Sequence, residues 1–217
     1  DGAVALVQAS ASCIPPGDNP GVWLGAILGE LAKAGRDKVT LVPSPALVAF
    51  GTWVEQLLAE STGKEGKGLL PIPGEPLGPP SVYGKDRVFV RFVLAGLAEP
   101  SVDQALETLQ AAGHPVIAIH LDDRLDLARE FFRWEVATAT AGSILRINPF
   151  DQPNVQESKG NTDRLLATVR ERGRLPEPGP RIREGGLSLF GAEGVGSLDK
   201  ALRRFFSQAD PRSYIAL

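Results

Sequence analysis

The alternation of apolar and polar residues predicts a chain of alternating helices and strands. Apolar residues at helical spacing follow Asn19 and Pro20, a pair typical of a helix start, and Gly35 ends that run. Shorter runs rich in β-branched and aromatic residues predict strands. The predicted helices cover residues 20–34, 45–61, 101–112, 125–147, about 154–172 and 198–206, and the predicted strands cover residues 38–43, 69–72, 87–94, 116–119 and 214–217.

Three stretches carry more detailed predictions. Ser101 and Gln104 have the spacing of a capping box, in which two side chains cap the start of a helix. Residues 125–147 are so largely apolar that we expect this helix to be mostly buried. Residues 73–83 form a loop rich in proline and glycine, and long loops of this kind are usually functional or mobile.

Strands that alternate with helices predict an α/β fold with a doubly wound, mostly parallel sheet and helices on both faces. In such sheets ligands bind beyond the carboxyl ends of the strands, which places the loops after Pro43 and His120 near a site. We expect one domain over residues 1–217. Within it, residues 176–186 are rich in proline, glycine and charge, and predict a linker to a short C-terminal helix and strand.

The composition is ordinary for a globular domain, since 43% of the 217 residues are hydrophobic and 23% are charged. A net charge of -3 offers no basic field for nucleic acid or an anionic membrane surface. Cys13 is the single cysteine, no Cys/His cluster has zinc spacing, and no apolar run is long enough to cross a membrane. We therefore expect a cytoplasmic protein without a bound metal. The chain has no Met, and we expect it to be a fragment of a larger chain.

The most informative stretch runs from Gly142 to Lys159 and reads Gly-Ser-Ile-Leu-Arg-Ile-Asn-Pro-Phe-Asp-Gln-Pro-Asn-Val-Gln-Glu-Ser-Lys. It resembles the C-terminal signature of phosphoglucose isomerases, which runs from a small residue through Phe-Asp-Gln and a following Val to a Lys. The family usually has Gly or Ala where this chain has Asn154. We therefore expect the loop to differ in shape.

A second stretch, from Glu55 to Lys64, reads Glu-Gln-Leu-Leu-Ala-Glu-Ser-Thr-Gly-Lys. It is similar to the family's other active-site stretch, where a Gln precedes a catalytic Glu by one helical turn and Ser-x-Gly-Lys follows. The two matches occur in the family's order. The sequence from Asn19 onward further looks like the isomerase part of bacterial transaldolase/phosphoglucose isomerase fusions. The chain is thus identified as a member of this family, as its C-terminal sugar-isomerase, or SIS-like, subdomain.

The resemblance implies an enzyme that interconverts glucose 6-phosphate and fructose 6-phosphate through an enediol, without a cofactor. Such chemistry needs a base over C1 and C2 and polar donors for the oxygens that acquire charge. The resemblance assigns Glu60 as the proton-shuttling base and gives Lys159 a part in ring opening or oxyanion stabilisation. The implied substrate contacts are Gln56, Gln152, Ser61 and Thr62. If the chain is helical from Asp151, Gln152 and Lys159 project to the same side.

Each of these assignments has an alternative without chemistry. Taken alone, Glu60 is a solvated carboxylate at a helix end and Lys159 is a surface lysine. His120 is a further candidate, for ring opening, because it lies near the carboxyl end of a predicted strand. Neither His120 nor His114 sits in a stretch that matches the family's histidine motif, and a structural role accounts for both.

Part of the family's site is missing from the sequence. The phosphate-binding loop and an essential arginine belong to an N-terminal subdomain that this chain lacks, so we expect half an active site and little activity from the isolated chain. Residues 63–68 lack P-loop spacing and follow a helix, which favours a turn with solvated lysines. The expected partners are the sugar phosphate and the missing subdomain, while a transaldolase domain and a homodimer stay open.

Two other functions compete with the isomerase. One is a sugar-phosphate-binding module without catalysis, favoured by the missing phosphate and histidine elements. The other is a dinucleotide-binding domain. The sequence disfavours it, because Ser44-Pro45 follows the first clear strand where Gly-x-Gly-x-x-Gly is required.

Overall fold

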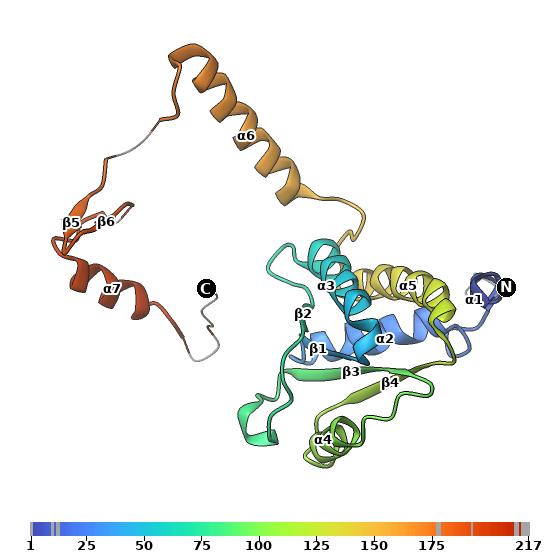
Figure 1. Cartoon of the computed structure of the whole chain (residues 1–217). Coiled ribbons are helices and arrows are strands. Elements are labelled where there is room, and N and C mark those ends of the chain that lie inside the picture. Colours follow the sequence, from blue (N-terminus) through green and yellow to red (C-terminus); the bar gives the residue numbers. More distant parts are fainter. Residues whose placement is uncertain are drawn as a thin grey trace. The chain divides into compact units, whose positions relative to one another are not determined.

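The structure is a computed structural model that describes residues 2–9, 11, 14–176, 179–191, 193–210 and 213 (Figure 1). Asp1–Pro153 forms one compact unit and Asn154–Leu217 forms a second. Cys13 and the strand predicted at 214–217 lie outside the described residues. Among the described helices, none is both long and apolar enough to span a membrane.

The first unit contains helices on both sides of a sheet. Its α-helices are α1 (Gly2–Ala9), α2 (Pro20–Lys33), α3 (Val48–Thr62), α4 (Pro100–Ala111) and α5 (Leu127–Leu145), and its short 3-10 helices are η1 (Pro45–Leu47), η2 (Pro80–Val82) and η3 (Arg124–Asp126). Its strands are β1 (Lys38–Pro43), β2 (Leu70–Pro73), β3 (Arg87–Leu94) and β4 (Val116–Leu121). Within the described residues, β1 and β3 begin and end where the sequence predicts.

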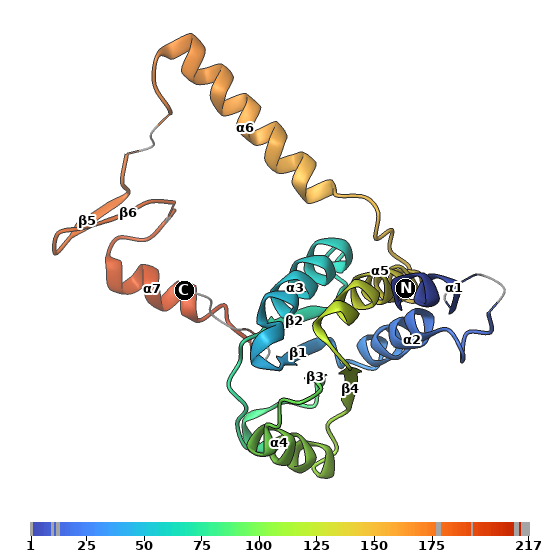
Figure 2. The same ribbon diagram turned by 45° about the vertical axis from the view of Figure 1, so that its right-hand side comes forward.

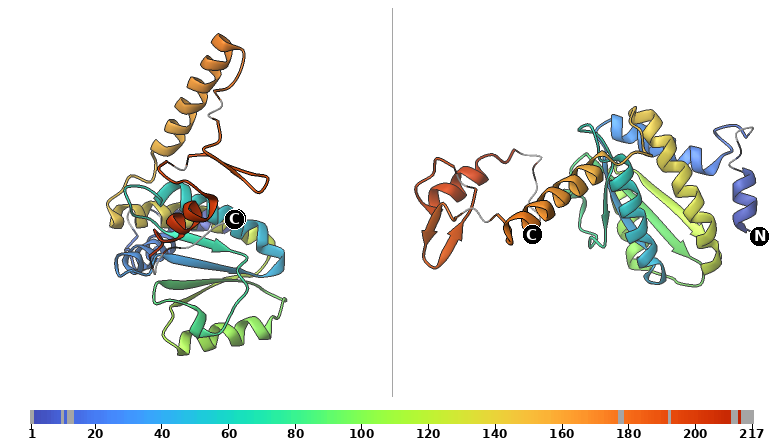
Figure 3. Two further views of the ribbon diagram at one scale, coloured as in Figure 1. Left: turned by 90° about the vertical axis from the view of Figure 1, so that its left-hand side faces the viewer. Right: turned by 90° about the horizontal axis from the view of Figure 1, so that it is seen from above.

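The sheet has the order β2-β1-β3-β4, and every neighbouring pair of strands is parallel. Helices α2, α3 and α5 cover one face, and α4 covers the other (Figures 2 and 3). The predicted α/β fold with a doubly wound parallel sheet and helices on both faces is therefore confirmed. Parallel sheets of this kind bury both faces, which explains the nearly continuous apolar run of β3.

The larger core cluster fills the space between the sheet and α2, α3 and α5, and it includes the fully buried Trp134. Helices α2 and α5 approach closely because glycines of α2 face α5. A Cβ added at Gly25 would lie 2.7 Å from the Cβ of Thr140, and one added at Gly21 would lie 2.7 Å from that of Val136. A smaller cluster, formed by Phe89, Leu106 and Leu109, joins α4 to the other face.

The helix starts follow the sequence signals in one case and depart from them in another. Asn19 caps α2 as predicted, since its side chain accepts hydrogen bonds from the amides of Gly21 and Val22. The capping box predicted at Ser101 is wrong, because α4 begins at Pro100 and its N-cap, Glu99, makes no side-chain cap. The Glu99 carboxylate instead accepts hydrogen bonds from other parts of the unit.

The long helix predicted at 125–147 is confirmed as η3 followed by α5, with much of its length buried. The sequence did not predict α1, which is only eight residues long. The α3 helix begins at Val48, because the Ser44-Pro45 start produces the 3-10 turn η1 first.

The second unit contains α6 (Pro153–Arg172) from its second residue onward, together with β5 (Ile182–Glu184), β6 (Leu187–Leu189) and α7 (Leu198–Phe206). None of the described residues of α6 is buried. Strands β5 and β6 form an antiparallel hairpin within this unit. Gly185 and Gly186 both have positive φ in its turn, as a two-residue hairpin loop requires. Strand β5 begins inside the stretch predicted as a linker, and α7 has the predicted bounds.

Candidate active site

The first matched segment, Glu55–Lys64, forms the second half of α3 and the turn after it. The buried positions Val54, Leu58 and Thr62 recur every four residues and face the core. Gln56 and Glu60 are also four residues apart, but they lie on the opposite face and are exposed. The structure therefore places this predicted pair side by side at the surface of α3, and Ser61 beside them is half-buried.

Thr62 is fully buried at the end of α3. Its hydroxyl donates to the carbonyl oxygen of Leu58 at 2.7 Å and accepts from the amide of Leu69 at 2.9 Å. Leu69 immediately precedes β2, so this hydroxyl fixes how the chain returns from the helix to the sheet. The sequence analysis predicted that Thr62 contacts the substrate, whereas the structure places its hydroxyl inside the fold, away from solvent.

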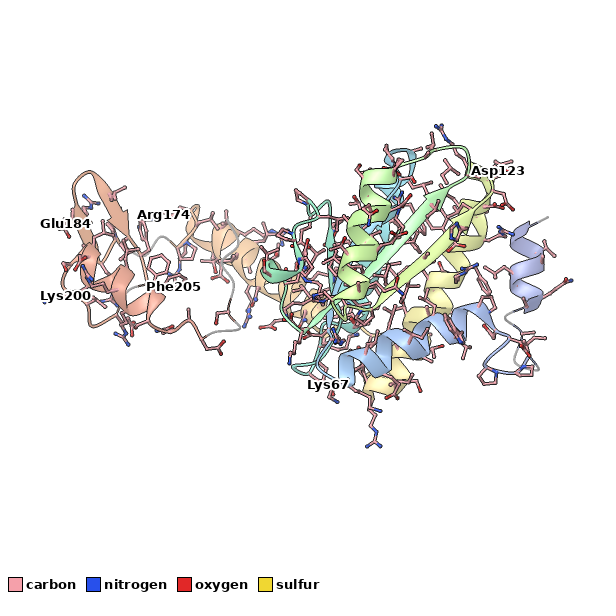
Figure 4. The ribbon with its side chains drawn as sticks, turned by 90° about the horizontal axis from the view of Figure 1, so that it is seen from below. Lys67, Asp123, Arg174, Glu184, Lys200 and Phe205 are labelled. Carbon is pink, nitrogen blue, oxygen red and sulfur yellow. The ribbon has the colours of Figure 1, made fainter. Side chains whose placement is uncertain are left out.

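The turn after α3 brings Lys64 and Lys67 together in a short antiparallel bridge, with Glu65 and Gly66 in left-handed conformations at its tip. Lys67 is exposed at the surface of this unit, as Figure 4 shows. Lys64 is buried, and its ammonium donates to the carbonyl oxygens of Asn148 at 2.7 Å and Asp151 at 2.5 Å. The prediction of solvated lysines in this turn is therefore wrong for Lys64.

Lys64 also forms an ion pair with the carboxylate of Asp151, at 2.7 Å. Asn148 and Asp151 belong to the second matched segment, Gly142–Lys159. The ammonium of Lys64 thus joins the two segments that the sequence analysis singled out, although its acceptors lie 84 and 87 residues away along the chain. The sequence offers no local signal for this contact, because a lysine in a glycine-rich turn is normally solvated.

The second matched segment turns sharply after α5. Arg146 ends the helix in a left-handed conformation, and the amide of Ile147 donates to the carbonyl oxygen of Gly142. Pro149 then packs over Gly142 so closely that an added Cβ would lie 2.9 Å from its Cγ. Gly142 is therefore the small residue that this turn needs.

Gln152 lies between this turn and α6 and is exposed. Helix α6 begins at Pro153, so Gln152 is not part of it. The condition under which Gln152 and Lys159 would share one helix face, a helix that starts at Asp151, is therefore not met. The carbonyl oxygen and carboxylate of Asp151 accept from Lys64, and Pro153 suits the first position of a helix. Lys159 is exposed on α6, in the second unit.

The turn after α3 lies at the amino-terminal edge of the sheet. Leu69 precedes β2, whose first residue, Leu70, pairs with the first residue of β1, Lys38. His120 lies near the carboxyl end of β4, at the opposite edge. Figure 4 shows the same separation, with Lys67 and Asp123 at opposite ends of the unit. The structure does not bring His120 together with Glu60.

A polar network occupies the carboxyl edge, where the sequence analysis expected ligands. Arg91 is buried and donates to the carboxylate of Glu99 at 2.7 Å. The same carboxylate accepts a hydrogen bond from the hydroxyl of the buried Ser44 at 2.8 Å. Burial would raise the pKa of Glu99, but the hydrogen bonds from Arg91 and Ser44 outweigh it and hold that pKa below its usual value. The sequence analysis did not identify this network, and its groups pair with one another.

His114 is buried against the aromatic rings of Tyr83 and Phe89, with centroids 6.0 and 5.8 Å away. Burial lowers the pKa of His114, and the nearby cations Arg36 and Arg87 lower it further. These contacts favour the structural interpretation of His114. The ring contacts of Tyr83 also hold the proline-rich loop against this unit. Within the loop, the Tyr83 hydroxyl donates a hydrogen bond to the carbonyl oxygen of Pro76.

An open hollow of about 540 Å³ lies beside the turn after α3, between α2 and the start of β2. Its polar lining includes Lys33, Asp37 and Lys67, but neither Gln56 nor Glu60. The exposed carboxylate of Glu60 therefore lies outside this hollow. Among the described residues, no group of three or more His, Cys, Asp or Glu side chains could hold a metal ion.

The known proteins that this chain resembles include glucose-6-phosphate isomerases. No family model matches the chain. It is 26% identical over 222 residues to the probable glucose-6-phosphate isomerase of Haloarcula marismortui, a match that covers 81% of this chain and 50% of that protein. It is 31% identical over 173 residues to the glucose-6-phosphate isomerase of Acholeplasma laidlawii, a match that covers 63% of this chain and 41% of that protein.

The fold has a counterpart among solved structures. The crystal structure of a glucose-6-phosphate isomerase from Chlamydia trachomatis matches with a TM-score of 0.53 at 16% identity, over 78% of this chain and 42% of that one. The chain spans about half the length, or less, of the curated relatives it matches. It is similar in sequence to glucose-6-phosphate isomerases and shares the fold of the matched part of the solved one.

Proposed function

We propose that this chain is the C-terminal sugar-isomerase domain of a glucose-6-phosphate isomerase and carries part of its active site. The reaction is the interconversion of glucose 6-phosphate and fructose 6-phosphate. The observation that carries the proposal is the contact between the two matched segments, in which Lys64 of one holds Asp151 of the other. This contact places the end of α3, with Glu60, and the stretch that leads to Gln152 at one edge of the sheet.

The proposed chemistry is proton transfer between adjacent carbons. Glu60 takes the proton from C2 of the open-chain aldose, and the electrons of that bond form the C1–C2 double bond of an enediol while O1 gains a proton. Return of the proton to C1 and loss of the proton on O2 give the ketose. An exposed carboxylate on one face of a helix suits this task once a partner surface excludes water from it.

The neighbouring side chains take supporting parts in this proposal. Gln56 lies one turn before Glu60 on the same face and can donate to a substrate hydroxyl, as can Gln152 and Ser61. Lys159 supplies a positive charge for the oxygen that becomes negative. The burial of Thr62 favours a supporting role in the fold over a contact with substrate.

The rest of the site must come from elsewhere in the protein. His120 lies at the other edge of the sheet from the end of α3, which argues against it as the group that opens the sugar ring. We propose that the phosphate-binding loop, an arginine and a histidine belong to other parts of a longer chain or to a second subunit. A preceding transaldolase domain, a homodimer, the cytoplasm as location and the absence of a cofactor stay predictions.

A coupled assay tests the proposal directly. A full-length parent that contains this sequence should interconvert the two hexose phosphates, while the isolated 217-residue chain should show little or no turnover. The alternative is a sugar-phosphate-binding module without catalysis. Fructose 6-phosphate that binds tightly to the full-length protein in calorimetry, with no turnover in the assay, would establish the module and contradict the isomerase.

A further inference from the structure

Lys64 differs from its neighbours in the turn after α3 by the number of its contacts. Its side chain is 5% exposed, and its ammonium donates to the carbonyl oxygens of Asn148 and Asp151 and to the carboxylate of Asp151. An ammonium has three donor hydrogens, so all of them have acceptors here. Lys67, three residues later, is 43% exposed and makes two long contacts, with the carbonyl oxygen of Arg146 at 3.5 Å and with the carboxylate of Glu65 at 4.0 Å.

The acceptors of Lys64 belong to a short turn whose shape depends on them. Two carbonyl groups and one carboxylate converge on one ammonium, and without it their partial and full negative charges would face one another. Hydrogen bonds from a charged donor are stronger than neutral ones, and burial strengthens them further. The ammonium therefore holds the chain over residues 148–151 in one conformation.

Lys64 is also close in sequence to the proposed base. It lies four residues after Glu60, just beyond the end of α3, and Thr62 between them anchors the helix end through Leu58 and Leu69. Gln152 directly follows Asp151. A chain of fixed contacts thus runs from the helix end that bears Glu60, through Lys64 and Asp151, to Gln152.

We propose that Lys64 is a positioning residue of the isomerase site, which fixes the stretch bearing Gln152 relative to the end of α3. It touches no substrate in this account and acts through Asp151 and Asn148. The inference rests on the proposed function, since it gives Glu60 and Gln152 parts in one reaction. Its structural half, the hold on residues 148–152, is independent of that function.

The structural half is tested on the chain itself by amide hydrogen exchange. Lys64→Met keeps the length of the side chain and removes the ammonium, and Lys67→Met is the matched control in the same turn. We expect the amide of Phe150, which donates to the side chain of Asn148, to exchange at least about tenfold faster in Lys64→Met than in the unaltered chain or Lys67→Met. Equal exchange in both variants would overturn the inference.

The functional half is tested in the full-length parent, with Glu60→Gln as the reference variant. We expect Lys64→Met to lower kcat at least about tenfold. KM should change less than threefold, because the groups that bind the substrate phosphate lie elsewhere. Lys67→Met should leave both kcat and KM unchanged. Loss of activity in Glu60→Gln together with normal kcat in Lys64→Met would overturn the positioning role alone. Normal activity in Glu60→Gln would instead contradict the proposed function, whatever the exchange result for Lys64→Met.

Discussion

Arg133 lies 3.3 Å from the carboxylate of Glu130, a side chain that is fully buried one turn into α5. Among the described residues, neither oxygen of Glu130 accepts a hydrogen bond. Burial raises the pKa of Glu130 above its usual value of 4.5, and the charges of Arg133 and Arg129 oppose this only in part. The folded protein therefore holds the proton of Glu130 more tightly than the unfolded chain does.

This difference predicts a pH dependence with a definite sign. Below the unfolded pKa, near 4.5, both states are protonated and Glu130 costs no stability. As the pH rises toward the folded pKa, the unfolded state loses its proton first, and the free energy of unfolding falls by about 1.4 kcal/mol for each unit of pKa difference. Glu130→Gln removes this dependence, so the variant should gain stability relative to the unaltered chain as the pH rises from 4 to 8.

Urea unfolding followed by tryptophan fluorescence measures the effect at both pH values. Glu135→Gln, an exposed glutamate on the same helix, is the control and should show no such trend. An equal difference between Glu130→Gln and the unaltered chain at pH 4 and pH 8 would contradict a raised pKa of the buried Glu130 carboxyl.

Gly25→Ala should destabilise the packing of α2 on α5. The new methyl group would overlap the backbone of Ala137 and lie 2.7 Å from the Cβ of Thr140, so the two helices must separate. We expect a loss of about 1–3 kcal/mol in the free energy of unfolding, larger than the gain in helix propensity. In Gly17→Ala the added Cβ meets nothing within 4 Å, so unfolding of this control should change little.

Thr62→Val should weaken the turn that leads from α3 to β2. The substitution keeps the shape of the side chain but leaves the buried amide of Leu69 without its acceptor. The expected loss is about 1–3 kcal/mol in the free energy of unfolding. Thr52→Val, on an exposed part of the same helix, is the control, and a loss of equal size in both variants would refute the special role of Thr62.

Much of the fold could be predicted from local patterns. Strands β1 and β3 are largely buried, so their sequences are mostly apolar and their limits are plain. Asn19 and Pro20 fix the start of α2 for local reasons of hydrogen bonding and backbone angle. The hairpin of β5 and β6 was missed because its surroundings are rich in proline and charge, although Gly185-Gly186 is a recognised turn signal.

The site was harder to predict because its contacts join distant parts of the chain. The burial of Lys64 depends on acceptors in the turn after α5, and a local pattern cannot show them.

The position of His120 relative to Glu60 could have been deduced from the sequence. A helix that follows a parallel strand returns to the amino-terminal edge, so Glu60, at the end of α3, had to lie away from the carboxyl end of β4. Glu99 does not cap α4 through its side chain because its carboxylate accepts hydrogen bonds from Arg91 of β3 and from Ser44, which follows β1.

The central claim is that Glu60 is the proton-shuttling base of an isomerase, and one substitution tests it most directly. Glu60→Gln in the full-length parent, measured by the coupled assay, should lower kcat about 100- to 10,000-fold, the usual contribution of a general base. Glu65→Gln, an exposed glutamate in the turn that follows, is the matched control and should keep normal turnover. Near-normal turnover by Glu60→Gln would contradict the account.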